Sequence, residues 1–380
     1  MSVLVKNINA VIGDSIVSTD IALTEGKFSA PDDSSYNTVI DGSGLLAVPG
    51  FIDTHIHGTG GFGTEDGTEE AILKMSEALI KEGVTSFFPT IYTDVMERIT
   101  GDAKAIASAA GKEKGASIAG IHVEGPFISP NKIGAQNPLG RKDPSEKAML
   151  EIIEAGKGLV RAMTCAPELP GIEKIVNIAK LNNIVLLMGH TDATYEEAEN
   201  GMHLGIHHAT HLFNAMTQLQ HRYPGVVGCV LMHPEMNAEL IMDGKHVKSD
   251  VVRFTIQTKG ADKIVAITDS LRPTMQKEGE LTANGVPVEM GDGLWVTKGN
   301  TSLIQGSALT MHKGFVNLVR WGIPVPDAVK LTATTPARIY SLADRGSIEN
   351  GKRADLVIMD PSLNIKYVFK EGELLCGTAD

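Results

Sequence analysis

The most informative segment of the sequence is Phe51-Ile52-Asp53-Thr54-His55-Ile56-His57. Pro49-Gly50 comes before it and Gly58 comes after it. Aromatic and β-branched residues between glycines predict a β-strand. Residues two apart on a strand face the same side, so Asp53, His55 and His57 share one face. Two imidazoles on one face suit a divalent metal ion. The alternative is a half-buried strand that carries two histidines without a ligand.

Downstream of this strand the pattern alternates between apolar strands and amphipathic helices up to about residue 346. Further strands are predicted at 84–90, 117–123, 159–166, 183–188, 206–211, 239–241 and 263–268. About eight β/α units over roughly 300 residues favour a (β/α)8 TIM-like barrel over a doubly wound sheet. The expected fold class is therefore α/β, with a metal-dependent hydrolase barrel over residues 49–346.

The two ends of the chain lack the alternation of strands and helices that the middle shows. Residues 1–48 and 347–380 hold short β-type runs broken by Gly, Asp and Pro. We expect the two termini to build one small β-sandwich domain beside the barrel. Within the barrel segment, Asn284-Gly285 between apolar runs predicts a β-hairpin insertion near 281–296.

Four polar residues stand where predicted strands end, namely Glu124, His190, His211 and Asp269. The carboxyl ends of parallel barrel strands meet on one face, where barrel enzymes place their chemistry. Each residue alone could be an ordinary loop residue or helix cap. Together with His55 and His57 they supply about the number of N and O ligands that two metal ions need.

A competing motif follows the first strand. Gly58-Thr59-Gly60-Gly61-Phe62-Gly63 matches the glycine spacing of a dinucleotide-binding loop. The strand before it, however, carries Asp and two His where a dinucleotide fold needs apolar residues. A dinucleotide site is therefore disfavoured. His122, which faces the same way as Glu124, is a candidate for a supporting or substrate-contact role.

Composition limits the class of protein. The 380 residues carry a formal net charge of -12, which argues against nucleic acid or an anionic membrane as partner. No apolar run reaches ~18 residues and the N-terminus lacks a signal-peptide pattern, so no membrane association is expected. Three scattered cysteines form no disulfide or zinc pattern, which predicts reduced thiols in a cytoplasmic protein.

Several segments together resemble a known family. The His55-Ile56-His57 strand is similar to the metal motif of the amidohydrolase superfamily. Within it, the chain resembles the N-acetylglucosamine-6-phosphate deacetylases along nearly its whole length. The segments that carry this resemblance are His122-Val123-Glu124-Gly125-Pro126-Phe127, Thr164-Cys165-Ala166-Pro167-Glu168, Gly189-His190-Thr191, Thr210-His211-Leu212-Phe213-Asn214-Ala215-Met216, Ile267-Thr268-Asp269 and Ala354-Asp355-Leu356-Val357.

The resemblance implies roles for individual residues. Glu124, His190 and His211 match the metal site common to the family, and His55 and His57 match a second site of members with His-x-His. Asp269 matches the catalytic acid/base. The matched substrate-contact positions are Ala135, Gln136, Asn214, Ala215, Arg222, His246, Ile304, Gln305 and Gly306. Some relatives have His where Gln136 stands, and Ser270-Leu271-Arg272-Pro273 departs from the small residues common after the aspartate.

The resemblance also implies a reaction. We expect hydrolysis of the N-acetyl group of N-acetylglucosamine 6-phosphate, with one or two divalent ions, zinc first and iron, manganese or cobalt as alternatives. Arg222 offers a bidentate fork for phosphate, and family members suggest a homodimer with phosphate contacts across the interface. Alternatives are the galacto epimer as substrate, another cyclic amidohydrolase such as a dihydroorotase or hydantoinase, and a non-catalytic relative.

Overall fold

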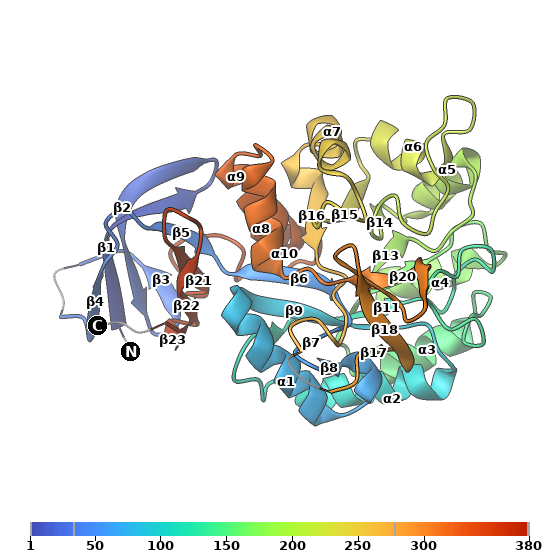
Figure 1. Cartoon of the computed structure of the whole chain (residues 1–380), viewed down its shortest axis with the longest axis horizontal. Helices are drawn as coiled ribbons and strands as arrows, with labels where there is room; N and C mark the ends of the chain where they lie inside the picture. The colour runs from blue at the N-terminus through green and yellow to red at the C-terminus, as the bar shows by residue number, and fades with distance from the viewer. Residues whose placement is uncertain (1, 33–34, 277–278, 378–380) are drawn as a thin grey trace.

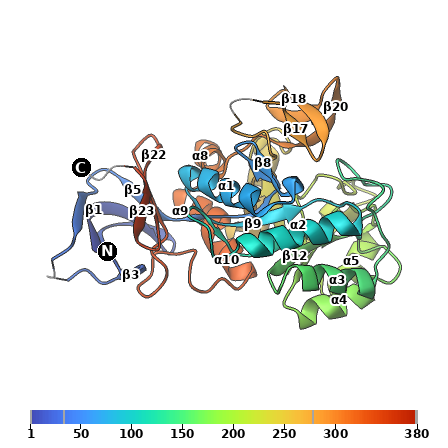
Figure 2. The same cartoon turned by 90° about the horizontal axis from the view of Figure 1, so that it is seen from below.

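A computed structural model describes residues 2–32, 35–276 and 279–377. It contains a β domain at one end and a barrel surrounded by helices at the other (Figure 1). Both chain ends lie in the β domain (Figures 1 and 2). In the parts of the chain so described, no helix is long and apolar enough to cross a bilayer.

Strands from the two termini join in one mixed sheet of eight strands. Its path runs β23-β22-β21-β5-β1-β2-β3, and β4 pairs with β1 in parallel. The buried Val5, Leu23 and Phe369 belong to one apolar cluster contributed by both ends of the chain. The expected β domain built from both termini is thereby confirmed, and its strands are joined in one mixed sheet where a sandwich was expected. Its strands are β1 Ser2–Ile12, β2 Ser15–Thr24, β3 Lys27–Ser29, β4 Thr38–Asp41, β5 Leu46–Pro49, β21 Leu356–Met359, β22 Ile365–Lys370 and β23 Glu373–Cys376.

Eight parallel strands form a nearly closed barrel, so the predicted TIM-like fold is confirmed. The last strand is joined to the first near their carboxyl ends, where the amide of Asp269, two residues after β16, donates to the carbonyl of His55 on β6 at 2.9 Å. The strand order is β6, β9, β11, β12, β13, β14, β15, β16, and a short β10 (Ser117–Ile118) extends the pairing on β9. The bounds are β6 Phe51–Ile56, β9 Val84–Ile91, β11 Ile121–Glu124, β12 Val160–Cys165, β13 Val185–Met188, β14 His208–Ala209, β15 Asn237–Ile241 and β16 Ile264–Ile267.

Helices cover the outside of the barrel, and most of them pack one apolar face against it. Thr68 and Thr194 accept N-terminal amide hydrogen bonds and so start two of them, the second through a capping box with Glu197. The helices are α1 Glu69–Leu79, α2 Met96–Ala109, α3 Glu146–Ala155, α4 Ile172–Leu181, α5 Tyr195–Leu204, α6 Gly225–Met232, α7 Ser249–Lys259, α8 Met311–Arg320, α9 Val325–Val329 and α10 Thr335–Ile339.

An antiparallel sheet stands out from the barrel between β16 and α8 (Figure 2). It has four strands, β17 Thr282–Ala283, β18 Val286–Gly291, β19 Leu294–Thr297 and β20 Asn300–Ser307. The predicted hairpin near 281–296 is the first part of this sheet, which continues to Ser307. The division of the chain into a β domain of residues 1–48 and 347–380 and a barrel domain of residues 49–346 stays a prediction.

The glycine-rich loop after β6 makes a small hairpin instead of a dinucleotide site. Strands β7 (Gly58–Thr59) and β8 (Phe62–Gly63) pair with each other. The amides of Gly58 and Gly61 donate to the carbonyls of Ser270 and Arg272 at 3.0 and 2.9 Å. The loop therefore binds its neighbouring barrel segment, and its glycines serve close packing of backbone on backbone.

Candidate active site and metal centre

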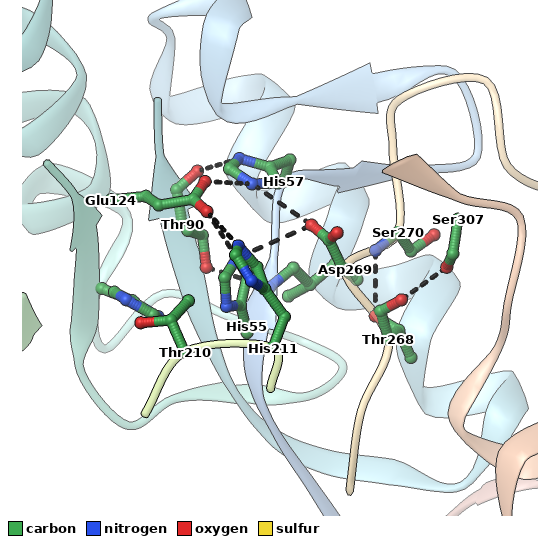
Figure 3. A network of polar contacts seen from close by, with 12 residues as sticks. His55, His57, Thr90, Glu124, Thr210, His211, Thr268, Asp269, Ser270 and Ser307 are labelled. Atoms are coloured by element: carbon green, nitrogen blue, oxygen red, sulfur yellow. Dashed lines mark hydrogen bonds and ion pairs between the residues drawn. The ribbon is translucent and has the colours of Figure 1, made fainter. Parts of the chain in front are cut away.

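The barrel topology brings the six predicted metal and acid residues to one mouth of the barrel. His55 lies on β6, Glu124 ends β11, and the other four lie one or two residues after their strands. A pocket of about 350 Å³ opens there, within the size range of small-molecule sites. Five of the six line it, namely His57, Glu124, His190, His211 and Asp269, and His55 lies buried beneath them. Figure 3 shows five of the six, His55, His57, Glu124, His211 and Asp269, converging from different parts of the barrel.

Glu124 lies at the centre of this group. Its Oε1 is 3.0 Å from His190 Nε2 and 2.9 Å from His211 Nε2. Its Oε2 is 3.1 Å from His57 Nε2 and accepts a 2.6 Å hydrogen bond from Gln136 Nε2. One carboxylate therefore faces histidines from three different strand ends, as a bridging metal ligand would.

Hydrogen bonds on the far side of the rings fix their orientation. Nδ1 of His57 lies 3.0 Å from the Thr90 carbonyl, and Nδ1 of His190 lies 2.9 Å from the Lys132 carbonyl. A carbonyl oxygen can only accept, so each Nδ1 carries a proton and Nε2 is the nitrogen that would face a metal ion in the pocket. His55 is also held through its Nδ1, which lies 3.0 Å from Glu239 Oε2.

Asp269 faces the paired histidines. Its Oδ1 is 3.6 Å from His55 Nε2 and 3.5 Å from His57 Nε2 (Figure 3). Its backbone has a φ of 50°, and His190 and His211 also have positive φ values, 48° and 27°. Left-handed conformations at non-glycine residues cost energy and gather at functional sites, where they aim a side chain into the pocket.

The charges in the site depend on one another. Burial opposes ionisation of Glu124, yet His55, His190 and His211 hold the pKa of this carboxyl well below its usual range. Burial likewise opposes protonation of His55, but the carboxylates of Glu239 and Glu124 raise its pKa well above the usual value. The carboxylates of the cluster therefore favour positive charge between them. Without a cation, protons on the histidines supply that charge.

The donor set fits divalent metal ions. His55 Nε2 is buried and has no hydrogen-bond partner, although it faces two carboxylates at 3.6–3.7 Å. Among the residues that the structure describes, three groups of side chains have ligand atoms close enough together to hold an ion, and two of these groups include residues that line the pocket. One is His55, His57 and Asp269, and the other is Glu124, His190 and His211. Imidazole and carboxylate ligands suit zinc and other first-row metals.

Eight of the nine predicted substrate contacts line the same pocket. These are Ala135, Gln136, Asn214, Ala215, His246, Ile304, Gln305 and Gly306. The last three come from β20, so the protruding sheet supplies one wall. Gln136 has a further task, because its Oε1 accepts from the Thr93 amide at 2.7 Å and this aims its Nε2 at Glu124.

The structure does not bring Arg222 into this pocket. Arg222 is exposed and lines a separate cavity of about 720 Å³. Lys132 lines both this cavity and the pocket at the barrel mouth. Lys132 is the only lysine or arginine among the described residues that line the first pocket. Sequence reasoning overlooked it because a single lysine in a loop carries no pattern.

Two more site residues escaped prediction. Tyr92 lines the pocket and stacks on His57, with ring centroids 3.7 Å apart and an interplanar angle of 14°. Burial and the carboxylates around it raise the pKa of Tyr92 well above its usual value, so the phenol stays neutral. Glu239 orients His55, but it lies inside β15 and not at a strand end. The one sign of Glu239 in the sequence is that a carboxylate stands within an otherwise apolar strand.

The amidohydrolase family profile matches residues 46–375. N-acetylglucosamine-6-phosphate deacetylase from Lysinibacillus sphaericus is 32% identical, with 98% of each chain covered. N-acetylgalactosamine-6-phosphate deacetylase from Escherichia coli O157:H7 is 29% identical, with 87% of each covered. A solved structure of mutant N-acetyl-D-glucosamine-6-phosphate deacetylase from Mycobacterium smegmatis, in complex with N-acetyl-D-glucosamine-6-phosphate, has a TM-score of 0.90 at 26% identity and 99% coverage of both chains. This chain belongs to the amidohydrolase family and, within it, to the N-acetylglucosamine-6-phosphate deacetylases.

Proposed function

We propose that this enzyme hydrolyses the acetamide of N-acetylglucosamine 6-phosphate to glucosamine 6-phosphate and acetate. One observation carries the proposal. Asp269 faces His55 and His57 within 3.6 Å, in a pocket that Glu124, His190 and His211 also line. A proton acceptor thus stands beside the histidines of the proposed metal centre, as water-driven amide hydrolysis requires.

Asp269 is proposed to move the proton of the reaction. It accepts a proton from the attacking water, whose oxygen bonds to the acetyl carbon. It then delivers that proton to the nitrogen as the carbon–nitrogen bond breaks, because an amine leaves only once it is protonated. A divalent ion in this centre would make water a better nucleophile and polarise the amide carbonyl.

The metal centre is proposed to use His55, His57, Glu124, His190 and His211. One or two ions fit the two donor groups, and zinc is the first candidate because imidazole and carboxylate are its usual catalytic ligands. Glu124 is the proposed bridge, since its two oxygens face histidines of both groups.

The sugar phosphate is proposed to lie along the wall formed by Asn214, Ala215, His246 and β20. His246 Nδ1 is 2.6 Å from Asp243 Oδ2, so its Nε2 is left for the ligand. Lys132 supplies positive charge from within the pocket. The exposed Arg222 is proposed to reach phosphate across the interface of a homodimer.

Acetate release from the two epimeric N-acetylhexosamine 6-phosphates tests the proposal. We expect the metal-loaded enzyme to prefer the gluco epimer and to use unphosphorylated N-acetylglucosamine poorly. The galacto epimer is the second candidate, because a relative of that name covers 87% of the chain. Release from neither epimer by metal-loaded protein would refute the proposed function.

Other cyclic amidohydrolases are less favoured. Dihydroorotases and hydantoinases resemble this chain in the barrel but use a carboxylated lysine as bridge, whereas Glu124 stands at the matching strand end here. Hydrolysis of dihydroorotate or a hydantoin in place of either sugar phosphate would support that alternative.

A further inference from the structure

Glu239 is a fully buried carboxylate beneath the metal centre. It lies on β15 at 0% exposure, and His55, also at 0%, is its closest charged neighbour. We propose that Glu239 is the positioning residue of the His55–His57 half of the centre and decides whether that half holds an ion. The inference deepens the proposed function, since it rests on the proposed metal dependence.

The contacts of Glu239 join segments that lie far apart in the sequence. Its Oε2 is 3.0 Å from His55 Nδ1 on β6 and 3.4 Å from the His211 backbone amide, which follows β14. Its own carbonyl accepts from the Leu212 amide at 2.8 Å. Within the described part of the chain, the only ligand ring that Glu239 contacts is therefore that of His55, because its contacts near His211 are to backbone amides and the one made by its side chain is long, at 3.4 Å.

The contact with His55 determines which nitrogen is free to bind a metal. An ionised carboxylate only accepts hydrogen bonds, so His55 Nδ1 carries a proton and Nε2 is the nitrogen left for a metal ion. Nε2 faces Glu124 Oε1 at 3.7 Å and Asp269 Oδ1 at 3.6 Å. Hydrogen bonding to a carboxylate also makes the ring a stronger metal ligand.

His55 differs from the other proposed histidine ligands in this respect. His57 and His190 use backbone carbonyls as partners of Nδ1, and no side-chain substitution removes a carbonyl. His211 Nδ1 has no partner in the described structure. Among the described residues, only Glu239 is a carboxylate bound to the outer nitrogen of a proposed ligand, so one substitution can weaken one half of the centre alone.

A competing interpretation is a third metal site, because His55, His122 and Glu239 also lie close together. Both nitrogens of His122 are already engaged. Nδ1 is 3.2 Å from the Thr54 carbonyl and Nε2 is 2.9 Å from Thr164 Oγ1. An ion there would break a contact of a buried ring that has no other partner, so the hydrogen-bonding role of Glu239 is favoured.

Metal titration of the intact protein tests this role without substrate. The apo protein is titrated with Zn²⁺ against a chromogenic chelator, and bound metal is counted by elemental analysis. We expect two ions in the parent. We expect Glu239→Leu to bind the weaker ion roughly 10–100-fold less tightly, the usual effect of losing such a partner, and to keep the other ion unchanged. Glu239→Gln should recover most of the loss, because its amide oxygen can still accept from His55.

Two comparison variants separate positioning from a general loss of stability. Asp355→Asn alters a carboxylate that is also buried but lies in the β domain, and it should leave both affinities unchanged. His57→Asn should remove the same ion as Glu239→Leu, and the double variant should lose no further ion.

Parent-like binding of both ions by Glu239→Leu would overturn the inference, and so would equal loss of both ions. Equal weakening by the Gln and Leu variants would also overturn it. If Glu239→Leu does not fold, Glu239→Gln is combined with His57→Asn instead. The inference then requires that the double variant binds the remaining ion as tightly as His57→Asn alone. Because no substrate is used, a parent that binds two ions but releases no acetate would refute the proposed function and leave this inference standing.

Discussion

Replacing Asp269 with asparagine tests the proposed proton transfer most directly. The structure predicts that folding is preserved. The Asp269 backbone is held by its amide on the His55 carbonyl at 2.9 Å and its carbonyl on the Ser307 amide at 3.0 Å, and neither bond uses the side chain. Its φ of 50° suits Asn at least as well as Asp. We therefore expect the free energy of unfolding to change by less than ~1 kcal/mol.

The catalytic effect should be much larger. An amide cannot accept the proton of water or deliver it to the leaving amine. Loss of a general acid/base costs ~10²–10⁴-fold in rate, which corresponds to ~3–5 kcal/mol of transition-state stabilisation. Steady-state acetate release should show this loss in kcat, while elemental analysis and thermal unfolding show metal content and stability close to those of the parent.

Asp292→Asn is the matched control. Asp292 also has a left-handed backbone, with a φ of 49°, but it lies between β18 and β19 and pairs with Lys245 at 2.7 Å outside the pocket. The same substitution there should leave kcat unchanged. An Asp269→Asn enzyme that turns over within a few-fold of the parent would refute the assigned role, whatever its stability.

Further predictions concern the metal, the phosphate and the folded state. Glu124→Gln should lose most bound metal, because a neutral amide cannot supply the bridging charge; full metal content by elemental analysis together with full activity would contradict the assignment. Lys132→Ala and Arg222→Ala should each raise KM for the phosphorylated sugar ~10-fold or more and leave the unphosphorylated sugar almost unaffected; equal effects on both sugars would remove these residues from phosphate binding. Burial raises the pKa of Asp102 from 3.8 to about 7, so the parent loses stability as the pH rises toward 7. Asp102→Asn should therefore be more stable than the parent by up to ~4 kcal/mol in urea unfolding at pH 8 and similar to it at pH 4; the same difference at both pH values would count against a buried acid.

Much of the architecture could be predicted because barrel strands are short apolar runs with regular spacing. Glu124 and Asp269 could be chosen because each follows such a run, and parallel topology brings strand ends together. Helix α6 was not predicted, since Gly225–Met232 is apolar and almost wholly buried and so lacks the one-sided pattern of a surface helix. Strand β20 was missed in part because its first five residues are exposed and read as a loop.

The site was less predictable where it depends on distant pairs. Glu239 and His55 are 184 positions apart, and nothing local in the sequence links them. Lys132 enters the pocket because of the path of the loop after β11, which periodicity cannot give. Arg222 was grouped with the pocket by resemblance, whereas within one chain it lies in the neighbouring cavity.

Both tryptophans of the chain stand beside loops that build the pocket. Trp295 on β19 is 5% exposed, donates to Thr274 Oγ1 at 2.9 Å, and belongs to the same apolar cluster as Tyr92. Trp321 packs against Gly244, two residues before His246. The tryptophan fluorescence of the protein therefore originates near two segments that line the pocket, those of Tyr92 and His246. Ligand affinity can be followed by emission titration, without a dye or a label, even in variants that no longer turn over.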